Sequence, residues 1–163
     1  MFSQDTCDMI RLLNKHHVET MIVGGYAAIY HGYVRFTADI DFFYKSDKEN
    51  SIRLFQAFQE FWEGTVPVIE SYLELTKKGR VFQFGQPPNR LDFINEIDGV
   101  VFEDCTDTMC TEIIQCVKEK LTIHFIGLDE LIINKKASGR PKDLIDADYL
   151  EKIKHRRSGR HRH

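Results

Sequence analysis

The sequence predicts a single α/β or α+β domain in which helices flank one mixed central sheet. The chain has 163 residues, the length of one ordinary domain. Segments with helical periodicity are interleaved with short runs rich in β-branched and aromatic residues. The composition is 42% hydrophobic and 29% charged, which supplies a core and excludes a disordered or collagen-like chain.

The helices are predicted from apolar residues that recur every three or four positions. The clearest helix spans 47–62, where large apolar side chains share one face and Ser46 or Asp47 can cap the start. These side chains are Leu54, Phe55, Phe58, Phe61 and Trp62. Further helices are predicted over 4–16, 26–31, 128–137 and 143–153.

The predicted strands are short and bounded by turn residues. A buried strand at 20–23 ends at the pair Gly24-Gly25, and a second strand is predicted at 39–44. The remaining predicted strands are 80–84, 91–94, 113–117 and 121–125.

Acidic and basic residues are distributed unevenly along the chain. Residues 1–151 hold all 25 acidic residues and 16 Lys or Arg, whereas residues 152–163 hold six Lys or Arg and no acid. We therefore expect a domain over 1–151 and a basic, disordered tail over 152–163. The acidic body is a poor general surface for nucleic acid, and only the tail is suited to contact phosphates.

The cysteines and the N-terminus indicate in which cellular compartment the protein is expected. Cys7, Cys105, Cys110 and Cys116 form no C-x-x-C pair and have no histidine at zinc-finger spacing. The N-terminus lacks the features of a signal peptide, and no apolar run approaches the ~20 residues of a membrane span. We expect a cytoplasmic protein with free thiols and no membrane partner. A structural zinc or a Cys105–Cys110 disulfide is the alternative.

The informative pattern is Gly24-Gly25 followed, after thirteen residues, by Asp39-Ile40-Asp41. Two glycines between a strand and a helix let an anion approach exposed backbone N–H groups. Asp39 and Asp41 are two apart on a strand, so both side chains point to one face. Paired carboxylates repel unless a cation lies between them, and such oxygen ligands favour Mg²⁺ or Mn²⁺.

A third carboxylate, Asp92, interrupts the apolar strand 91–94. A buried charge is costly unless it is paired or coordinates a metal, so Asp92 is a candidate metal ligand. The alternative is an ion pair with Arg90 or Arg80. Three acids beside a phosphate-accepting turn are the parts of a two-metal site for phosphoryl or nucleotidyl transfer.

These motifs resemble the nucleotidyltransferase superfamily, whose fold is shared with DNA polymerase beta. The segments 22–28 and 35–41 look like the branch of AbiEii/AbiGii-type bacterial toxins, and so do segments 127–137 and 140–146. The resemblance covers roughly residues 18–150, and it implies the nucleotidyltransferase fold. Relatives of the AbiEii type usually carry a second, helical lobe that this chain lacks, so a homodimer or a partner chain is one expectation.

The resemblance also implies roles for individual residues. Asp39 and Asp41 would bind Mg²⁺ (or Mn²⁺), and Asp92 would complete the metal site and help to activate the attacking hydroxyl. Gly24 and Gly25 would hold the nucleotide phosphates.

Residues flanking this centre also match the family. Lys135 would face the triphosphate, and Arg35 and Thr37 would reach the nucleotide. Asp143 matches a family aspartate that orients a basic partner, although it could instead be the N-cap of the last helix.

The implied activity is transfer of a nucleoside monophosphate from a nucleoside triphosphate, such as ATP or GTP, to an acceptor hydroxyl. The acceptor could be RNA such as a tRNA end, a protein or a small molecule. One alternative is a catalytically silent nucleotide- or partner-binding module of a toxin–antitoxin system. Another is a metal-dependent phosphohydrolase that uses the same carboxylates on water.

Overall fold

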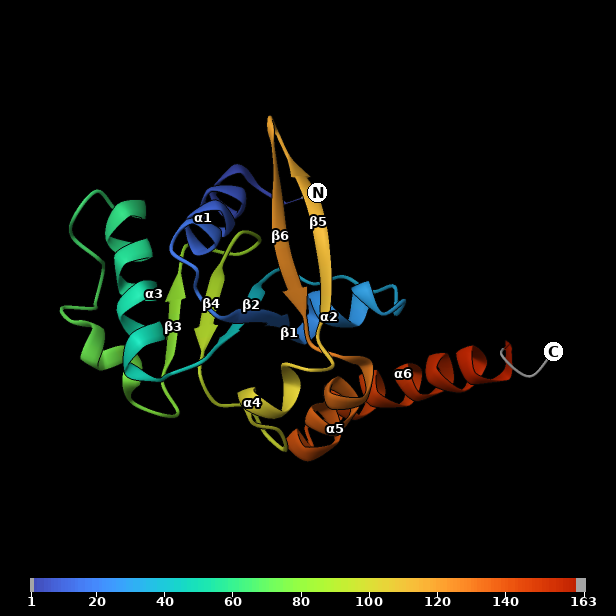
Figure 1. Ribbon diagram of the computed structural model, residues 1–163. Coiled ribbons are helices and arrows are strands. Elements are labelled where there is room, and N and C mark those ends of the chain that lie inside the picture. Colours follow the sequence, from blue (N-terminus) through green and yellow to red (C-terminus); the bar gives the residue numbers. More distant parts are fainter. Residues whose placement is uncertain (1, 161–163) are drawn as a thin grey trace.

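The computed structural model describes residues 2–160 as one α+β domain built on a mixed six-stranded sheet (Figure 1). The strands are β1 (Thr20–Val23), β2 (Ile40–Tyr44), β3 (Val81–Phe84), β4 (Leu91–Ile94), β5 (Cys110–Cys116) and β6 (Glu119–Phe125). The helices are α1 (Gln4–Lys15), α2 (Gly24–Tyr30), α3 (Lys48–Phe61), α4 (Phe102–Cys105), α5 (Leu128–Ser138) and α6 (Pro141–Arg160), with a 3₁₀ segment, η1, at Tyr72–Thr76. The predicted class, with helices flanking one mixed sheet, is confirmed.

The sheet order is β3-β4-β2-β1-β6-β5. β2 lies near its centre, antiparallel to β1 and parallel to β4. The register places Asp41 opposite Val23 on one side and opposite Asp92 on the other. Because paired residues share a face of the sheet, Asp41 and Asp92 project from the same face.

The two faces of the sheet are covered differently. On one face, Phe58 of α3 packs against Phe93 of β4 with ring centroids 4.8 Å apart, and Phe93 stacks on Phe42 of β2. On the other face, Phe43 of β2 packs against Phe102 of α4 at 5.3 Å. Since side chains alternate along a strand, Asp41 projects from the same face as Phe43, away from α3.

The start of α2 and the course of α6 differ from expectation. Helix α2 begins at Gly24 rather than after the glycine pair. Helix α6 begins at Pro141, a residue well suited to a first helical position, so Asp143 lies inside the helix and is not its N-cap. The expected domain boundary at 151 also falls inside α6, which continues to Arg160.

Contacts with the body explain why the helix continues through most of the expected basic tail. Arg157 donates a hydrogen bond to the carbonyl oxygen of His31 at 2.8 Å, and Lys154 forms an ion pair with Asp129. Ile153 packs against the core. The remaining tail residues, 161–163, lie outside the described residues.

The expectation of four free thiols is wrong. Cys7 of α1 and Cys116 of β5 form a disulfide, with their Cα atoms 5.9 Å apart. The two cysteines are 109 residues apart in the sequence, so no local spacing indicates their pairing. Cys105 and Cys110 are free, and the alternative pairing between them is therefore not formed.

Between residues 2 and 160, no helix combines the length and the apolar character that crossing a bilayer requires.

Candidate functional site

The turn between β1 and α2 is shaped around two neighbouring side chains. Gly24 has φ of +67°, and a Cβ placed on it would lie 2.1 Å from Oδ2 of Asp41. A Cβ on Gly25 would lie 2.4 Å from Oγ1 of Thr37. The two glycines therefore let the Asp41 carboxylate and the Thr37 hydroxyl lie directly against the backbone of this turn.

Asp41 occupies an electrostatically unfavourable position. Burial raises the pKa of its carboxyl to about 7, and the negative charges of Asp92 and Asp39 add to the effect. The positive charges of Lys135 and Arg90 oppose the shift but do not cancel it. A group that is half protonated near neutral pH and surrounded by other acids would be stabilised as a carboxylate by an added cation.

Arg90 lies between the other two carboxylates. Its Nε donates to Oδ1 of Asp92 at 2.8 Å, and its Nη2 donates to Oδ2 of Asp92 at 3.0 Å. Nη2 also lies 2.8 Å from Oδ2 of Asp39. The alternative reading of Asp92 as the partner of Arg90 is therefore what the structure shows, whereas Arg80 pairs with Glu74.

One oxygen of this cluster has no partner. Oδ1 of Asp39 is buried and accepts no hydrogen bond from any of the described residues. A buried carboxylate oxygen without a donor is costly, and a cation would satisfy it. Even so, no three His, Cys, Asp or Glu side chains in residues 2–160 are grouped closely enough to hold a metal ion. The donor atoms fit a divalent cation in chemistry, but their side chains must rearrange to surround it.

Lys135 lies near the carboxylates but is ion-paired. It lines a pocket of about 360 Å³ together with Gly24 and Asp41. Its Nζ lies 2.9 Å from Asp143 and 2.9 Å from Asp146, and the residue is only 5% exposed. The structure therefore places Lys135 in one pocket with Gly24 and Asp41, with its positive charge already compensated by α6.

Asp143 contacts two basic side chains and one hydroxyl. It accepts hydrogen bonds from Lys135, Ser138 and Arg140. Burial alone would raise the pKa of its carboxyl, but the hydrogen bonds from Ser138 and Lys135 and the charge of Lys135 lower it to about 2. Asp143 is therefore a carboxylate at neutral pH and holds Lys135 in place.

Arg35 joins the same network from the loop before β2. Its Nη2 donates to Oδ2 of Asp146 at 3.0 Å, while its Nε is buried with no partner among residues 2–160. Nη2 lies close to Gly25, because a Cβ on that glycine would be 3.2 Å away. Arg35 and Thr37 thus both border the glycine turn.

Sequence reasoning assigned no role to Asp146 and considered Arg90 only as an ion-pair partner. Asp146 is 1% exposed and bridges Arg35 to Lys135. Its spacing of three from Asp143 on a helix, which puts both on one face, was the available signal. For Arg90 the signal was its spacing of two from Asp92, directly before the strand that carries Asp92.

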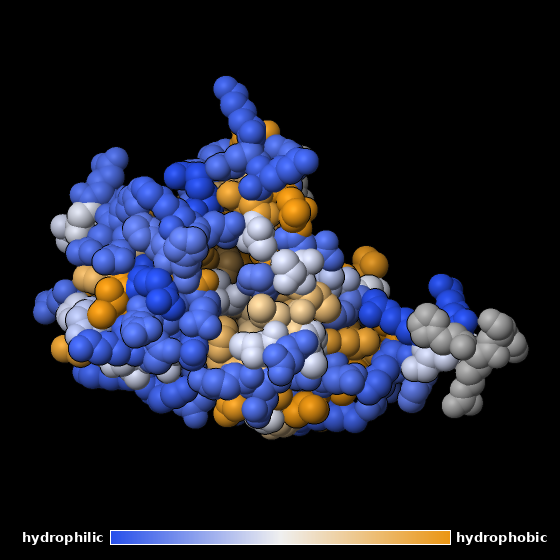
Figure 2. Space-filling view, viewed as in Figure 1, coloured by the Kyte–Doolittle hydropathy of each residue, from blue (hydrophilic) through white to orange (hydrophobic). Residues whose placement is uncertain are grey.

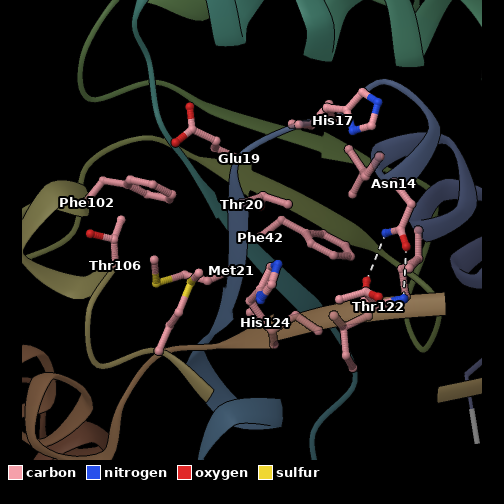
Figure 3. Close-up of a pocket in the computed structure, with 16 residues that line it drawn as sticks. Asn14, His17, Glu19, Thr20, Met21, Phe42, Phe102, Thr106, Thr122 and His124 are labelled. Carbon is pink, nitrogen blue, oxygen red and sulfur yellow. Dashed lines mark hydrogen bonds between the residues drawn. The ribbon is translucent and has the colours of Figure 1, made fainter. Parts of the chain in front are cut away.

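A second pocket, of about 410 Å³, lies elsewhere (Figure 3). It is bordered by α1, by the N-terminal end of β1 and by β6, and Asn14 pairs with the backbone of Thr122 at its edge. None of the residues that the sequence singled out for the nucleotide or the metal lines it. The face seen in Figure 2 is mainly hydrophilic, with hydrophobic residues exposed in a hollow below the hairpin of β5 and β6.

In comparisons with known proteins, no protein-family model and no curated protein matches this chain.

Proposed function

We propose that this protein is a Mg²⁺-dependent nucleotidyltransferase with the polymerase-beta-like fold, of the AbiEii/AbiGii-type toxin branch. The observation that carries the proposal is the packing of the Asp41 carboxylate against Gly24, with Asp92 beside it on the paired strand. This arrangement puts acidic side chains against a turn whose backbone an anion can approach. Asp39 adds a buried oxygen that has no hydrogen-bond partner among residues 2–160.

The proposal assigns a task to each part of the site. Asp39, Asp41 and Asp92 would hold Mg²⁺ or Mn²⁺, which neutralises phosphate charge when bound. The turn at Gly24 and Gly25 would contact the phosphates of the nucleoside triphosphate.

The flanking groups would position the substrates. Lys135, Arg35 and Thr37 would orient the triphosphate, and Asp92 would accept the proton of the attacking hydroxyl. Attack on the α-phosphorus forms the new P–O bond, and the bond to the leaving pyrophosphate breaks. An RNA, a protein or a small molecule would be the acceptor, and a homodimer or a partner chain would complete the acceptor side.

A transfer assay tests the proposal. Each of four α-labelled nucleoside triphosphates is incubated with Mg²⁺, total cellular RNA and clarified lysate. We expect label in RNA, protein or a small molecule with the wild type and none with Asp41→Asn. Asp107→Asn is the same substitution at an exposed aspartate that does not line the pocket of Gly24 and Asp41, so it serves as the matched control and should keep full transfer.

A catalytically silent nucleotide- or partner-binding module is the second candidate. The observation that favours it is that Arg90 and Lys135 are both already paired with carboxylates. Tight, Mg²⁺-dependent binding of a nucleoside triphosphate without transfer would support this candidate. Release of free nucleoside monophosphate would instead indicate a phosphohydrolase.

A further inference from the structure

The guanidinium of Arg90 makes the contacts that a bridging cation would make. It contacts Asp92 through two nitrogens, at 2.8 and 3.0 Å, and Asp39 through one, at 2.8 Å. Both oxygens of Asp92 and one oxygen of Asp39 are thereby occupied by a positive charge that belongs to the chain itself. A bidentate guanidinium–carboxylate pair is among the stronger ion pairs in proteins.

The backbone of Arg90 is fixed, while its side chain is partly accessible. The carbonyl oxygen of Arg90 accepts a hydrogen bond from the N–H of Ile40 at 3.1 Å, which ties the residue to the start of β2. Its side chain is 28% exposed. The guanidinium can therefore move without any change in the strand pairing.

The two carboxylates hold Arg90 unequally. Asp92 is 8% exposed, binds the guanidinium in bidentate fashion and also accepts a hydrogen bond from Gln83 at 3.3 Å. Asp39 is 26% exposed and has a single contact with Arg90, and no group in the described part of the chain bonds its other oxygen. The contact with Asp39 is therefore the one that a competing cation would break first.

From these contacts we propose that Arg90 is an internal counter-cation, which holds Asp39 and Asp92 when no divalent cation is bound and releases Asp39 when one binds. This inference rests on the proposed function, because it concerns the same carboxylates. Arg90 is a positioning residue in this role. It keeps the carboxylates together in the metal-free protein, and its bond to Asp92 keeps that side chain oriented after Asp39 has turned to the cation.

Arg90→Gln tests the competition because it removes the charge but keeps a polar side chain that can donate hydrogen bonds. Binding is measured with Mn²⁺ alone, by the electron paramagnetic resonance signal of the free ion. We expect Arg90→Gln to bind Mn²⁺ roughly tenfold or more tightly than the wild type, since a competing positive charge within ion-pair distance is gone. In EDTA, without metal, the Tm of Arg90→Gln should lie below that of the wild type. Added Mn²⁺ should raise the Tm of Arg90→Gln by more than it raises that of the wild type.

Two further variants keep the test decisive. Arg80→Gln removes an exposed arginine that pairs with Glu74 and should bind Mn²⁺ as the wild type does. Arg90→Lys keeps a positive charge but lacks the planar guanidinium that binds Asp92 through two nitrogens, so its affinity for Mn²⁺ should lie between those of the wild type and Arg90→Gln. It also serves as the test if Arg90→Gln does not fold.

The outcomes separate this inference from the proposed function. If the wild type and the Arg90 variants bind Mn²⁺ with equal affinity, or the variants bind it more weakly, the role of Arg90 is overturned and the proposed function stands. If no form binds Mn²⁺ at millimolar concentration and the wild type transfers no nucleotide, the proposed function fails and this inference fails with it.

Discussion

The absence of a side chain at one residue decides where the Asp41 carboxylate can lie. Gly24 has φ of +67°, and the nearest oxygen of Asp41 occupies the space that a Cβ would need. Gly139, at the end of α5, has the same φ of +67° but no atom within 4 Å of a Cβ position. The two glycines thus share a backbone requirement and differ only in their surroundings.

Gly24→Ala should therefore cost more stability than Gly139→Ala. The shared positive φ costs about 1 to 2 kcal/mol in each variant. The clash with Asp41 adds about 2 kcal/mol more at Gly24. The free energies of unfolding are compared by urea titration. An equal decrease in the free energy of unfolding in the two variants would contradict the close packing of Asp41 on the turn.

The raised pKa of Asp41 predicts a stabilising substitution. The Asp41 carboxyl has a pKa of about 7 in the folded protein, compared with its ordinary value of 3.8 in the unfolded chain. Its ionised form therefore destabilises the fold. This cost is absent below pH 3.8, grows as the pH rises and is complete above pH 7. Asp41→Asn, which carries no charge, should therefore raise the stability in EDTA by on the order of 2 kcal/mol at pH 8 and little at pH 4.

Tm measurements at the two pH values check this prediction. Asp107→Asn, an exposed substitution, should leave the Tm nearly unchanged at both. A lower Tm for Asp41→Asn than for the wild type at pH 8 would show that the carboxylate is favourable where it lies. The three clustered carboxylates would then not destabilise the metal-free protein by repelling one another.

At the scale of elements, the pairing of α5 with α6 depends on a buried ion cluster. Lys135 of α5 is held by Asp143 and Asp146 of α6, and Asp146 is shared with Arg35. The cluster fixes α6 beside the loop before β2. A buried ion pair is costly to break from one side, because the remaining charges lose their partner.

Lys135→Met should thus destabilise the protein by about 3 kcal/mol, since two buried carboxylates are left without their shared cation. Lys136→Met provides the matched control. Its side chain is 52% exposed and pairs with Glu151, so its loss should cost less than about 1 kcal/mol. Chemical denaturation of both variants gives the comparison. A similar cost for both would mean that the carboxylates find other partners.

The disulfide links α1 to β5 across 109 residues of sequence. Closing a loop of that size restricts the unfolded chain, and we expect reduction to lower stability by about 2 to 4 kcal/mol. The Tm should fall when reductant is added to the wild type. The double variant Cys7→Ser/Cys116→Ser should start at the lower Tm and not respond to reductant.

Cys110→Ser is the control for this experiment. Cys110 is a free cysteine, so its variant should respond to reductant as the wild type does. A Tm of the wild type that is insensitive to reductant would contradict a stabilising role for the Cys7–Cys116 bond.

For the molecule as a whole, the sequence predicted what depends on neighbours along the chain. The periodicity of 47–62 identified α3, and its start at the cap Asp47 is confirmed by a hydrogen bond from the N–H of Asn50 at 2.8 Å. The motif residues Gly24, Asp41 and Asp92 do lie together, because β2 pairs with both β1 and β4. Helix α3 and its cap rest on local patterns that propensity and spacing express directly, whereas the meeting of the three motif residues also needs the pairing of strands.

What the sequence could not predict depends on contacts between distant segments. The simultaneous pairing of Arg90 with Asp39 and Asp92 requires the parallel pairing of β2 with β4, whose register no local pattern specifies. The disulfide and the continuation of α6 along the body have the same origin. In each case a tertiary contact overrides the local tendency.

The strand order also divides the candidate site between two cooperative parts of the sheet. Gly24 directly follows β1, and Asp41 belongs to β2, the antiparallel partner of β1. Arg90 directly precedes β4, and Asp92 belongs to β4, which pairs with β3 at the sheet's end. An end pair of strands opens more readily than the centre of a sheet. Any ligand that contacts both pairs therefore links them, and its binding should slow amide hydrogen exchange in β3 and β4 more than in β1.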